Sequence, residues 1–76
     1  MTIYRVQVYC SPREILLEAD LRYLWDVKEG NFIEVNGRTF RITGVVLGGR
    51  IQWTEAELPE GAFVIPMAQT GGPAIP

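Results

Sequence analysis

The pair Asn36-Gly37 separates two stretches in which apolar and polar residues alternate, and no other feature of the sequence restricts the fold as strongly. A type I′ turn needs positive φ at both central positions, and asparagine and glycine tolerate this best. The pattern predicts a β-hairpin of about residues 31–36 and 38–46. A two-residue turn also sets the register. The expected cross-strand pairs are Val35 with Arg38, Glu34 with Thr39, Ile33 with Phe40, and Phe32 with Arg41.

A second two-residue turn at Gly48-Gly49 predicts a third strand at about residues 50–54. The expected pairs are Val46 with Ile51 and Gly44 with Trp53. Because a glycine inside a strand leaves a gap, we expect the Trp53 ring to cover Gly44. The three strands would form an antiparallel meander.

Apolar and polar residues also alternate near the start of the chain, which predicts a strand over about residues 2–10. After it, Ser11, Pro12 and Glu14 have the spacing of a helix N-cap, a first helical position and a capping box. The residues that follow at helical spacing are Leu17, Leu21, Leu24 and Trp25. The sequence therefore predicts a helix of about residues 12–25. An alternative remains open, in which residues 14–17 form a strand and only a short helical turn follows Asp20.

An apolar run at residues 63–67 is continuous, which is typical of a strand covered on both faces. Pro66 has no backbone N–H, so this strand is expected to lie at a sheet edge or to end there. Residues 54–61 between it and the preceding strand favour a loop or a short helical turn.

These elements predict a mainly β fold with one helix, in the α+β class. Four or five strands in so short a chain favour a small antiparallel barrel or half-barrel of SH3-like or OB-like kind. A helix packed on one open sheet is the alternative. We place a single domain at residues 1–67 and an uncharged tail rich in Gly and Pro at residues 68–76. Such a tail is expected to fray unless the domain itself or a neighbouring subunit holds it.

Size and composition narrow the functional classes. A chain of 76 residues buries only about 60% of its unfolded surface, and folds of this size often depend on association with other chains. The single cysteine, Cys10, cannot form an internal disulfide, and without histidine we expect neither a metal site nor a cofactor. Seven basic against nine acidic residues argue against nucleic-acid binding.

We expect a protein that is neither membrane-embedded nor secreted. No apolar run approaches the roughly 18 residues that a membrane span requires. Residues 1–5 also lack the apolar block of a signal peptide.

The residues that could act in catalysis are better explained by a structural role. The acids of the loop after the third hairpin strand are Glu55, Glu57 and Glu60, and we expect them to be solvated. Cys10 has no histidine to activate it and is expected in the core. Residues 48–50 lack the ending of a phosphate-binding loop and predict a turn. We therefore expect no enzymatic activity.

One segment resembles a known family. Residues 30–45 read GNFIEVNGRTFRITGV, which is similar to a pattern in small structural proteins of tailed phages, notably head–tail connector and head-completion proteins. Asn31 stands where that pattern usually has Asp, and Phe40 where it usually has Tyr. The resemblance implies a non-enzymatic virion component of barrel type (capsid, connector or tail) that forms rings or fills gaps between subunits. It would be found in the virion or the host cytoplasm.

We therefore expect the protein to contact other protein subunits, as a homo-oligomer or in a hetero-assembly. The residues expected to make these contacts are Phe63, Ile65, Met67, Gly71, Gly72, Pro73, Ile75 and Pro76. Two alternatives remain: a small adaptor module that binds a peptide by strand addition, and a single-stranded nucleic-acid binder, which the acidic composition disfavours.

Overall fold

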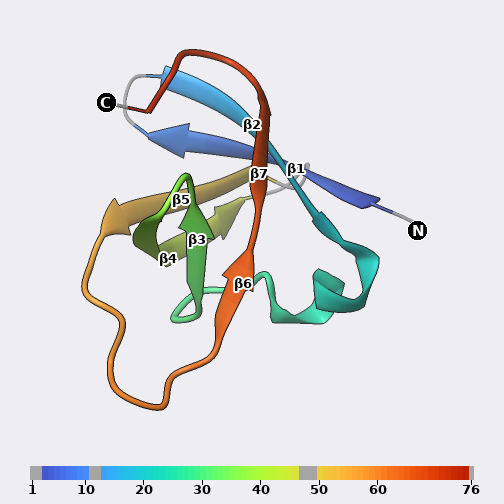
Figure 1. Cartoon of the computed structure of the whole chain (residues 1–76). Coiled ribbons are helices and arrows are strands. Elements are labelled where there is room, and N and C mark those ends of the chain that lie inside the picture. The colour runs from blue at the N-terminus through green and yellow to red at the C-terminus, as the bar shows by residue number, and fades with distance from the viewer. Residues whose placement is uncertain (1–2, 11–12, 47–49, 76) are drawn as a thin grey trace.

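In the computed structural model, the described residues form one seven-stranded sheet with a single short helix (Figure 1). The structure describes residues 3–10, 13–46 and 50–75; for Ile3, Tyr4, Tyr9, Cys10 and Arg13 it describes only the backbone. The elements in chain order are β1 (Ile3–Cys10), β2 (Arg13–Asp20), the 3₁₀ helix η1 (Leu21–Asp26), β3 (Phe32–Val35), β4 (Arg38–Val46), β5 (Arg50–Glu55), β6 (Val64–Pro66) and β7 (Ala68–Gly71). The fold is therefore mainly β.

The hairpin of β3 and β4 confirms the sequence prediction. Asn36 and Gly37 have φ angles of 53° and 79°, as a type I′ turn requires. All four expected pairs are present, from Val35 with Arg38 to Phe32 with Arg41. The hairpin face that was expected to be apolar is buried throughout; it consists of Ile33, Val35, Phe40 and Ile42.

The predicted register of β4 against β5 is wrong. Next to the turn it is shifted by one residue, so that Val46 lies opposite Arg50 and Gly44 opposite Gln52. A bulge at Thr43 then adds one residue to β4, so that Trp53 lies opposite Ile42. Trp53 therefore packs on Phe40, with ring centroids 4.0 Å apart, and does not cover Gly44. The proposed turn at residues 48–49 lies outside the described residues.

The predicted helix of residues 12–25 is also wrong, and the alternative reading is the one the structure adopts. Residues 13–20 form β2, which pairs with β1 along its whole length. Ile15, Leu17 and Ala19 alternate inward and are buried, so the period of two prevails over the helical spacing of the leucines. The helix is confined to η1, where the Asp20 carboxylate accepts a hydrogen bond of 3.1 Å from the Arg22 amide. The expected cap at Ser11 and Pro12 lies outside the described residues.

A single stretch of chain, residues 64–71, lies at both ends of the strand order β6-β3-β4-β5-β1-β2-β7. Its first half, β6, pairs in parallel with β3, and its second half, β7, pairs antiparallel with β2. The predicted edge position of Pro66 is therefore confirmed. The expected covering on both faces is wrong, because Ile65 is buried whereas Pro66 is exposed.

The region assigned to the tail is held by the protein's own body. Residues 68–71 are a strand of the sheet rather than a tail. The Thr70 hydroxyl donates to the Leu16 carbonyl at 3.3 Å, and the Gln69 side chain donates to the Pro73 carbonyl at 2.7 Å. Ile75 packs against the core. The domain therefore continues past Met67.

The core lies on the inner face of the sheet and receives residues from every strand except β7. Its buried members are Val6, Val8, Ile15, Leu17, Ala19, Ile33, Val35, Phe40, Ile42, Ile51, Trp53, Ile65 and Met67. The one buried side-chain polar atom without a hydrogen-bond partner among the described residues is Nε1 of Trp53. The expected burial of Cys10 lies outside the described side chains.

Gly72 joins the end of β7 to the last residues and cannot be replaced without strain. Its φ is 88°, and a Cβ there would lie 2.8 Å from Cα of Ile15 and closer still to the Glu14 carbonyl oxygen. We expect Gly72→Ala to lower the free energy of unfolding by roughly 3 kcal/mol or more, since backbone strain and a clash add. Gly61→Ala is the matched control, because Gly61 has a φ of 77° in open space and should lose only about 1–2 kcal/mol. Equal losses in urea unfolding would contradict the close approach at Gly72.

Arg38 and Glu55 join β4 to β5 through two hydrogen bonds of 2.7 and 3.0 Å. The hydrogen bond from Arg38, aided by its charge, holds the pKa of Glu55 below its ordinary value of 4.5. A lowered pKa in the folded state means that this stabilisation is present at neutral pH and is lost as the pH falls through the folded-state pKa. We expect Glu55→Gln to be less stable than the unmodified chain at pH 7. The difference should shrink as the pH falls below 4.5, as followed by urea unfolding. A difference that stays constant over this range would contradict the assignment.

Candidate interaction surface

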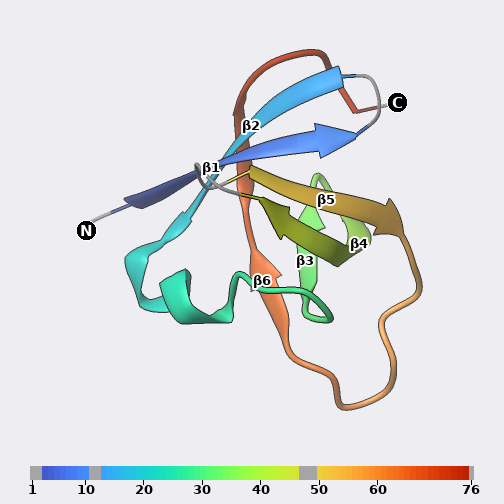
Figure 2. The same cartoon turned by 180° about the vertical axis from the view of Figure 1, so that it is seen from behind.

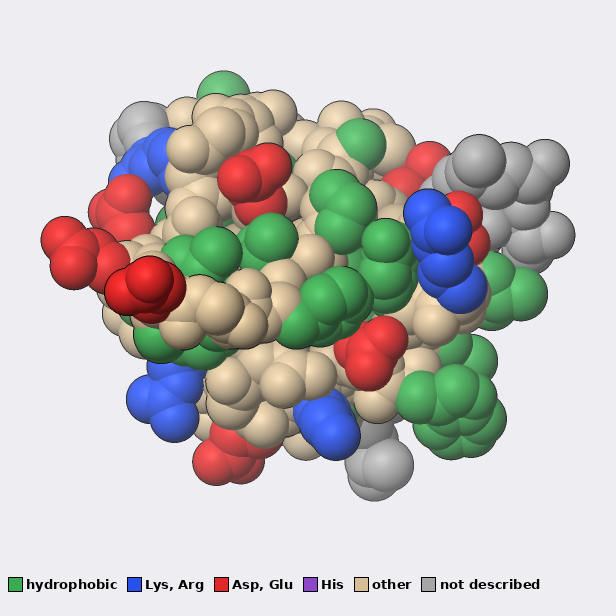
Figure 3. Space-filling view, turned by 60° about the horizontal axis from the view of Figure 1, so that its bottom comes forward, with side chains coloured by type: hydrophobic (Ala, Val, Ile, Leu, Met, Phe, Trp, Pro, Cys, Tyr) green, Lys and Arg blue, Asp and Glu red, His purple; other side chains and the backbone are tan. Residues whose placement is uncertain are grey.

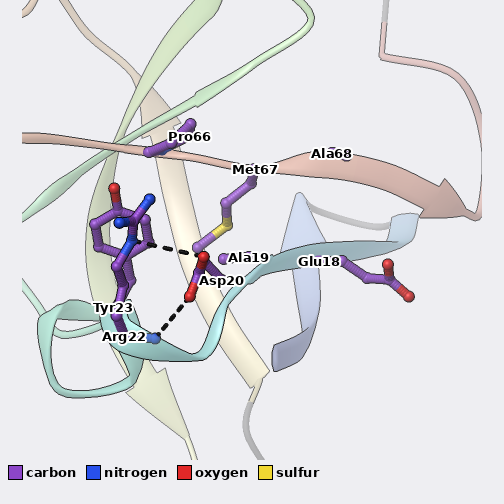
Figure 4. A pocket seen from close by; sticks show the side chains of 8 residues that line it. All are labelled: Glu18, Ala19, Asp20, Arg22, Tyr23, Pro66, Met67 and Ala68. Carbon is purple, nitrogen blue, oxygen red and sulfur yellow. Dashed lines mark hydrogen bonds and ion pairs between the residues drawn. The ribbon is translucent and has the colours of Figure 1, made fainter. Parts of the chain in front are cut away.

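An open pocket of about 370 Å³ lies where β2 separates from the stretch that forms β6 and β7 (Figure 4). The β2–β7 pairing ends at Glu18 and Ala68, and the β3–β6 pairing reaches Pro66. The pocket therefore lies between the end of β2, where η1 begins, and the junction of β6 and β7. Its lining residues are Glu18, Ala19, Asp20, Arg22, Tyr23, Pro66, Met67 and Ala68.

The chemistry of this pocket is mostly apolar. Met67 and Ala19, both buried, face one another across it, and the Tyr23 ring lies to one side (Figure 4). Its acids are already paired: Glu18 with Arg5 at 2.8 Å and Asp20 with Arg22 at 3.6 Å. Among the described residues, no group of three or more His, Cys, Asp or Glu side chains could hold a metal ion.

Tyr23 also links the pocket to a more exposed apolar surface. Its ring lies 5.7 Å from that of Phe63, which precedes β6 and is 51% exposed. On the same short helix, Trp25 is 85% exposed and Leu21 is 44% exposed. Figure 3 shows hydrophobic side chains in a band across this end of the molecule, with acidic side chains along it. We call Leu21, Tyr23, Trp25 and Phe63 the η1 surface.

The residues expected to contact a partner differ in their exposure in the structure. Ile65 is fully buried in the core, and Met67 is buried but lines the open pocket. Phe63, Gly72 and Pro73 are exposed, whereas Gly71 and Ile75 are half-buried. Pro76 lies outside the described residues. Whether the accessible ones bind a partner stays a prediction.

Leu21 and Trp25 were not predicted to be surface residues, because both were assigned to the inner face of the predicted helix of residues 12–25. With residues 13–20 in a strand, these side chains have no helix face to share with Leu17. A signal for the correct assignment was present in Asp20, which follows the alternating stretch directly and suits the N-cap of a new helix. A second exposed apolar pair, Val45 and Val46 at the end of β4, was also not anticipated.

Comparisons of the chain with protein-family models, curated proteins and solved structures gave no significant match. Within the described part of the chain, no helix combines the length and apolar character that a membrane crossing by a helix would need.

The exposure of Trp25 predicts that this large side chain contributes little to folding. We expect Trp25→Ala to change the free energy of unfolding by less than about 0.5 kcal/mol. Trp53→Ala is the matched control, because Trp53 is buried against Phe40 and its loss should cost roughly 3–5 kcal/mol. Urea unfolding of the two variants separates these effects. A loss above about 1 kcal/mol for Trp25→Ala would mean that the side chain packs within its own domain.

Proposed function

We propose that the protein is a non-enzymatic structural subunit of a larger protein assembly, of the kind found in tailed-phage capsids, connectors or tails. The observation that carries this proposal is the η1 surface, where Trp25, Phe63 and Leu21 remain exposed although the core is fully formed elsewhere. Small proteins rarely leave such side chains together in water unless they meet a partner. Trp and Tyr are also prominent among residues that dominate binding energy at interfaces.

The architecture supports a subunit of the SH3-like or OB-like half-barrel type. Both ends of the strand order belong to residues 64–71, so the sheet curves far enough for one stretch to pair with β3 and with β2. The segment of residues 30–45, which resembles phage connector and head-completion proteins, contains the β3–β4 hairpin of this sheet. We place the protein in the virion or the host cytoplasm on that resemblance.

The arrangement of the carboxylates supports a structural role for them. Glu18 and Glu55 form ion pairs with Arg5 and Arg38 at 2.8 and 2.7 Å across neighbouring strands. Glu14 lies 3.6 Å from Arg50 and accepts a hydrogen bond from Gln7. The contact of Glu14 with Arg50 joins β2 to β5, which are distant in the sequence, and the other contacts join consecutive strands.

Peptide binding by strand addition has less support than subunit assembly. The strands at the ends of the order, β6 and β7, have only three and four residues. Pro66 also removes one donor from the edge that an added strand would use.

Light scattering tests the proposal directly. We expect the unmodified chain to have a mass several times its monomer mass of 8.6 kDa, and Trp25→Ala to shift the mass toward the monomer while remaining folded. Asn36→Asp is the control, because it changes an exposed turn position that either residue suits. A monomer at every concentration would contradict self-assembly and favour an adaptor that binds another protein.

A further inference from the structure

Trp25 and the open pocket at the end of β2 are neighbours on one end of the molecule. Arg22 and Tyr23 of η1 form one side of the pocket (Figure 4). Side chains three residues apart coincide in a 3₁₀ helix, so Trp25 projects from the same side of η1 as Arg22. The view from behind also has η1 beside β6 (Figure 2). An exposed indole ring and an apolar opening therefore share one face.

None of the described side chains fills this pocket. Trp25 is 85% exposed, although it stands one helical turn from the pocket-lining Arg22. The volume of about 370 Å³ is within the range of about 300–1,000 Å³ that small-molecule sites occupy. The pocket therefore has room for one large aromatic side chain.

The lining of the pocket suits an indole ring. Met67 and Pro66 provide apolar walls, and a methionine sulfur packs favourably against aromatic rings. The Arg22 guanidinium already lies 5.1 Å from the centre of the Tyr23 ring, and such a cation also stacks on tryptophan. The Asp20 carboxylate accepts from Arg22 and retains further acceptor sites, so it can also accept from an indole N–H.

We propose that Trp25 of one copy inserts into this pocket of a second copy, and that Trp25 of the second copy inserts into the pocket of the first. This inference rests on the proposed function and names the partner as a second copy of the same chain. A two-fold contact uses the same surface on both copies, which an anchor and a pocket on one face permit. The resulting pair is the unit from which the larger assembly is built.

The rest of the η1 surface adds area around the two anchors. A tryptophan side chain buries about 150–250 Å², so the two rings supply about 300–500 Å² of the roughly 1,200–2,000 Å² that a stable pair buries. Leu21 and Phe63 are 44% and 51% exposed, and Phe63 contacts the pocket-lining Tyr23. We therefore expect an association that depends on concentration, with Trp25 as its main source of binding energy.

Two variants separate the anchor from the pocket. Trp25→Ala removes the anchor and leaves the pocket open. Ala68→Phe blocks the pocket and keeps the anchor, because Ala68 is exposed and lines the opening. We expect each variant alone to associate more weakly than the unmodified chain by roughly tenfold or more in light scattering. Thr54→Phe is the matched control, since it adds the same ring at an exposed position of β5 outside the pocket lining; it should associate like the unmodified chain.

An equimolar mixture of the two variants tests the exchange directly, after circular dichroism has shown that both fold. Trp25 of the Ala68→Phe chain can enter the open pocket of the Trp25→Ala chain, so the mixture should pair more strongly than either variant alone. Each such pair contains one Trp25, whereas Trp53 is buried in both chains. We expect the tryptophan emission to shift to shorter wavelength on mixing. A mixture that does not pair, or that pairs without this shift, would overturn the exchange of Trp25.

A measurement on the unmodified chain covers the case in which Ala68→Phe disturbs β7. Its tryptophan emission should shift to longer wavelength on dilution, because Trp25 returns to water as the pairs separate. Assembly that persists at full strength in Ala68→Phe, or that dissociates without a change in emission, would overturn this inference and leave the assembly function intact. An unmodified chain that is monomeric at every concentration would overturn both.

Discussion

The pairing of residues 64–71 with two strands that are distant in sequence is the interaction on which the rest of the structure depends. Its first half bonds to β3 and its second half to β2, and the Met67 amide continues the contact with a hydrogen bond of 3.0 Å to the Glu34 carbonyl. Ile65 and Met67 thereby close the core against residues from both ends of the sheet. Without this stretch β3 and β2 would become the unpaired edges of the sheet, and unpaired edges are sites of aggregation in small β proteins.

The parts of the fold that could be predicted from the sequence are those that local chemistry determines. Asn36-Gly37 requires positive φ, and this requirement alone gave the turn, the register and the buried face of the hairpin. The edge position of Pro66 followed in the same way from a missing donor. In each case the information lies within a few residues of the feature.

The errors arose where distant contacts decide the structure. Residues 13–20 carry both a period of two and leucines at helical spacing, and pairing with β1 selects the strand. The register of β4 against β5 is one residue off beside the turn, and the bulge at Thr43 shifts it once more. Gly44, a glycine inside a strand, is a signal for such a bulge, but it was interpreted as a gap covered by Trp53. The η1 surface was not predicted because residues 13–20 were assigned to a helix. Trp25 is exposed because β2 ends at Asp20 and only the short helix η1 follows. Phe63 was among the expected contact residues only as a member of the apolar run at residues 63–67.

The use of residues 64–71 in the core changes which part of the molecule can serve assembly. The sequence predicted that the apolar strand at residues 63–67 and the tail at residues 68–76 both contact a partner. In the structure Ile65 is buried in the core and β7 is paired with β2. Removal of the chain beyond Met67 would delete β7 and leave β2 without its partner at residues 16–18, so loss of assembly in such a truncation could not be separated from loss of folding. Exposed side chains on η1 lack this ambiguity, because they lie outside the buried core. Residues 64–71 complete the sheet, whereas the exposed side chains lie on other elements. Folding and association can therefore be measured independently in this small chain.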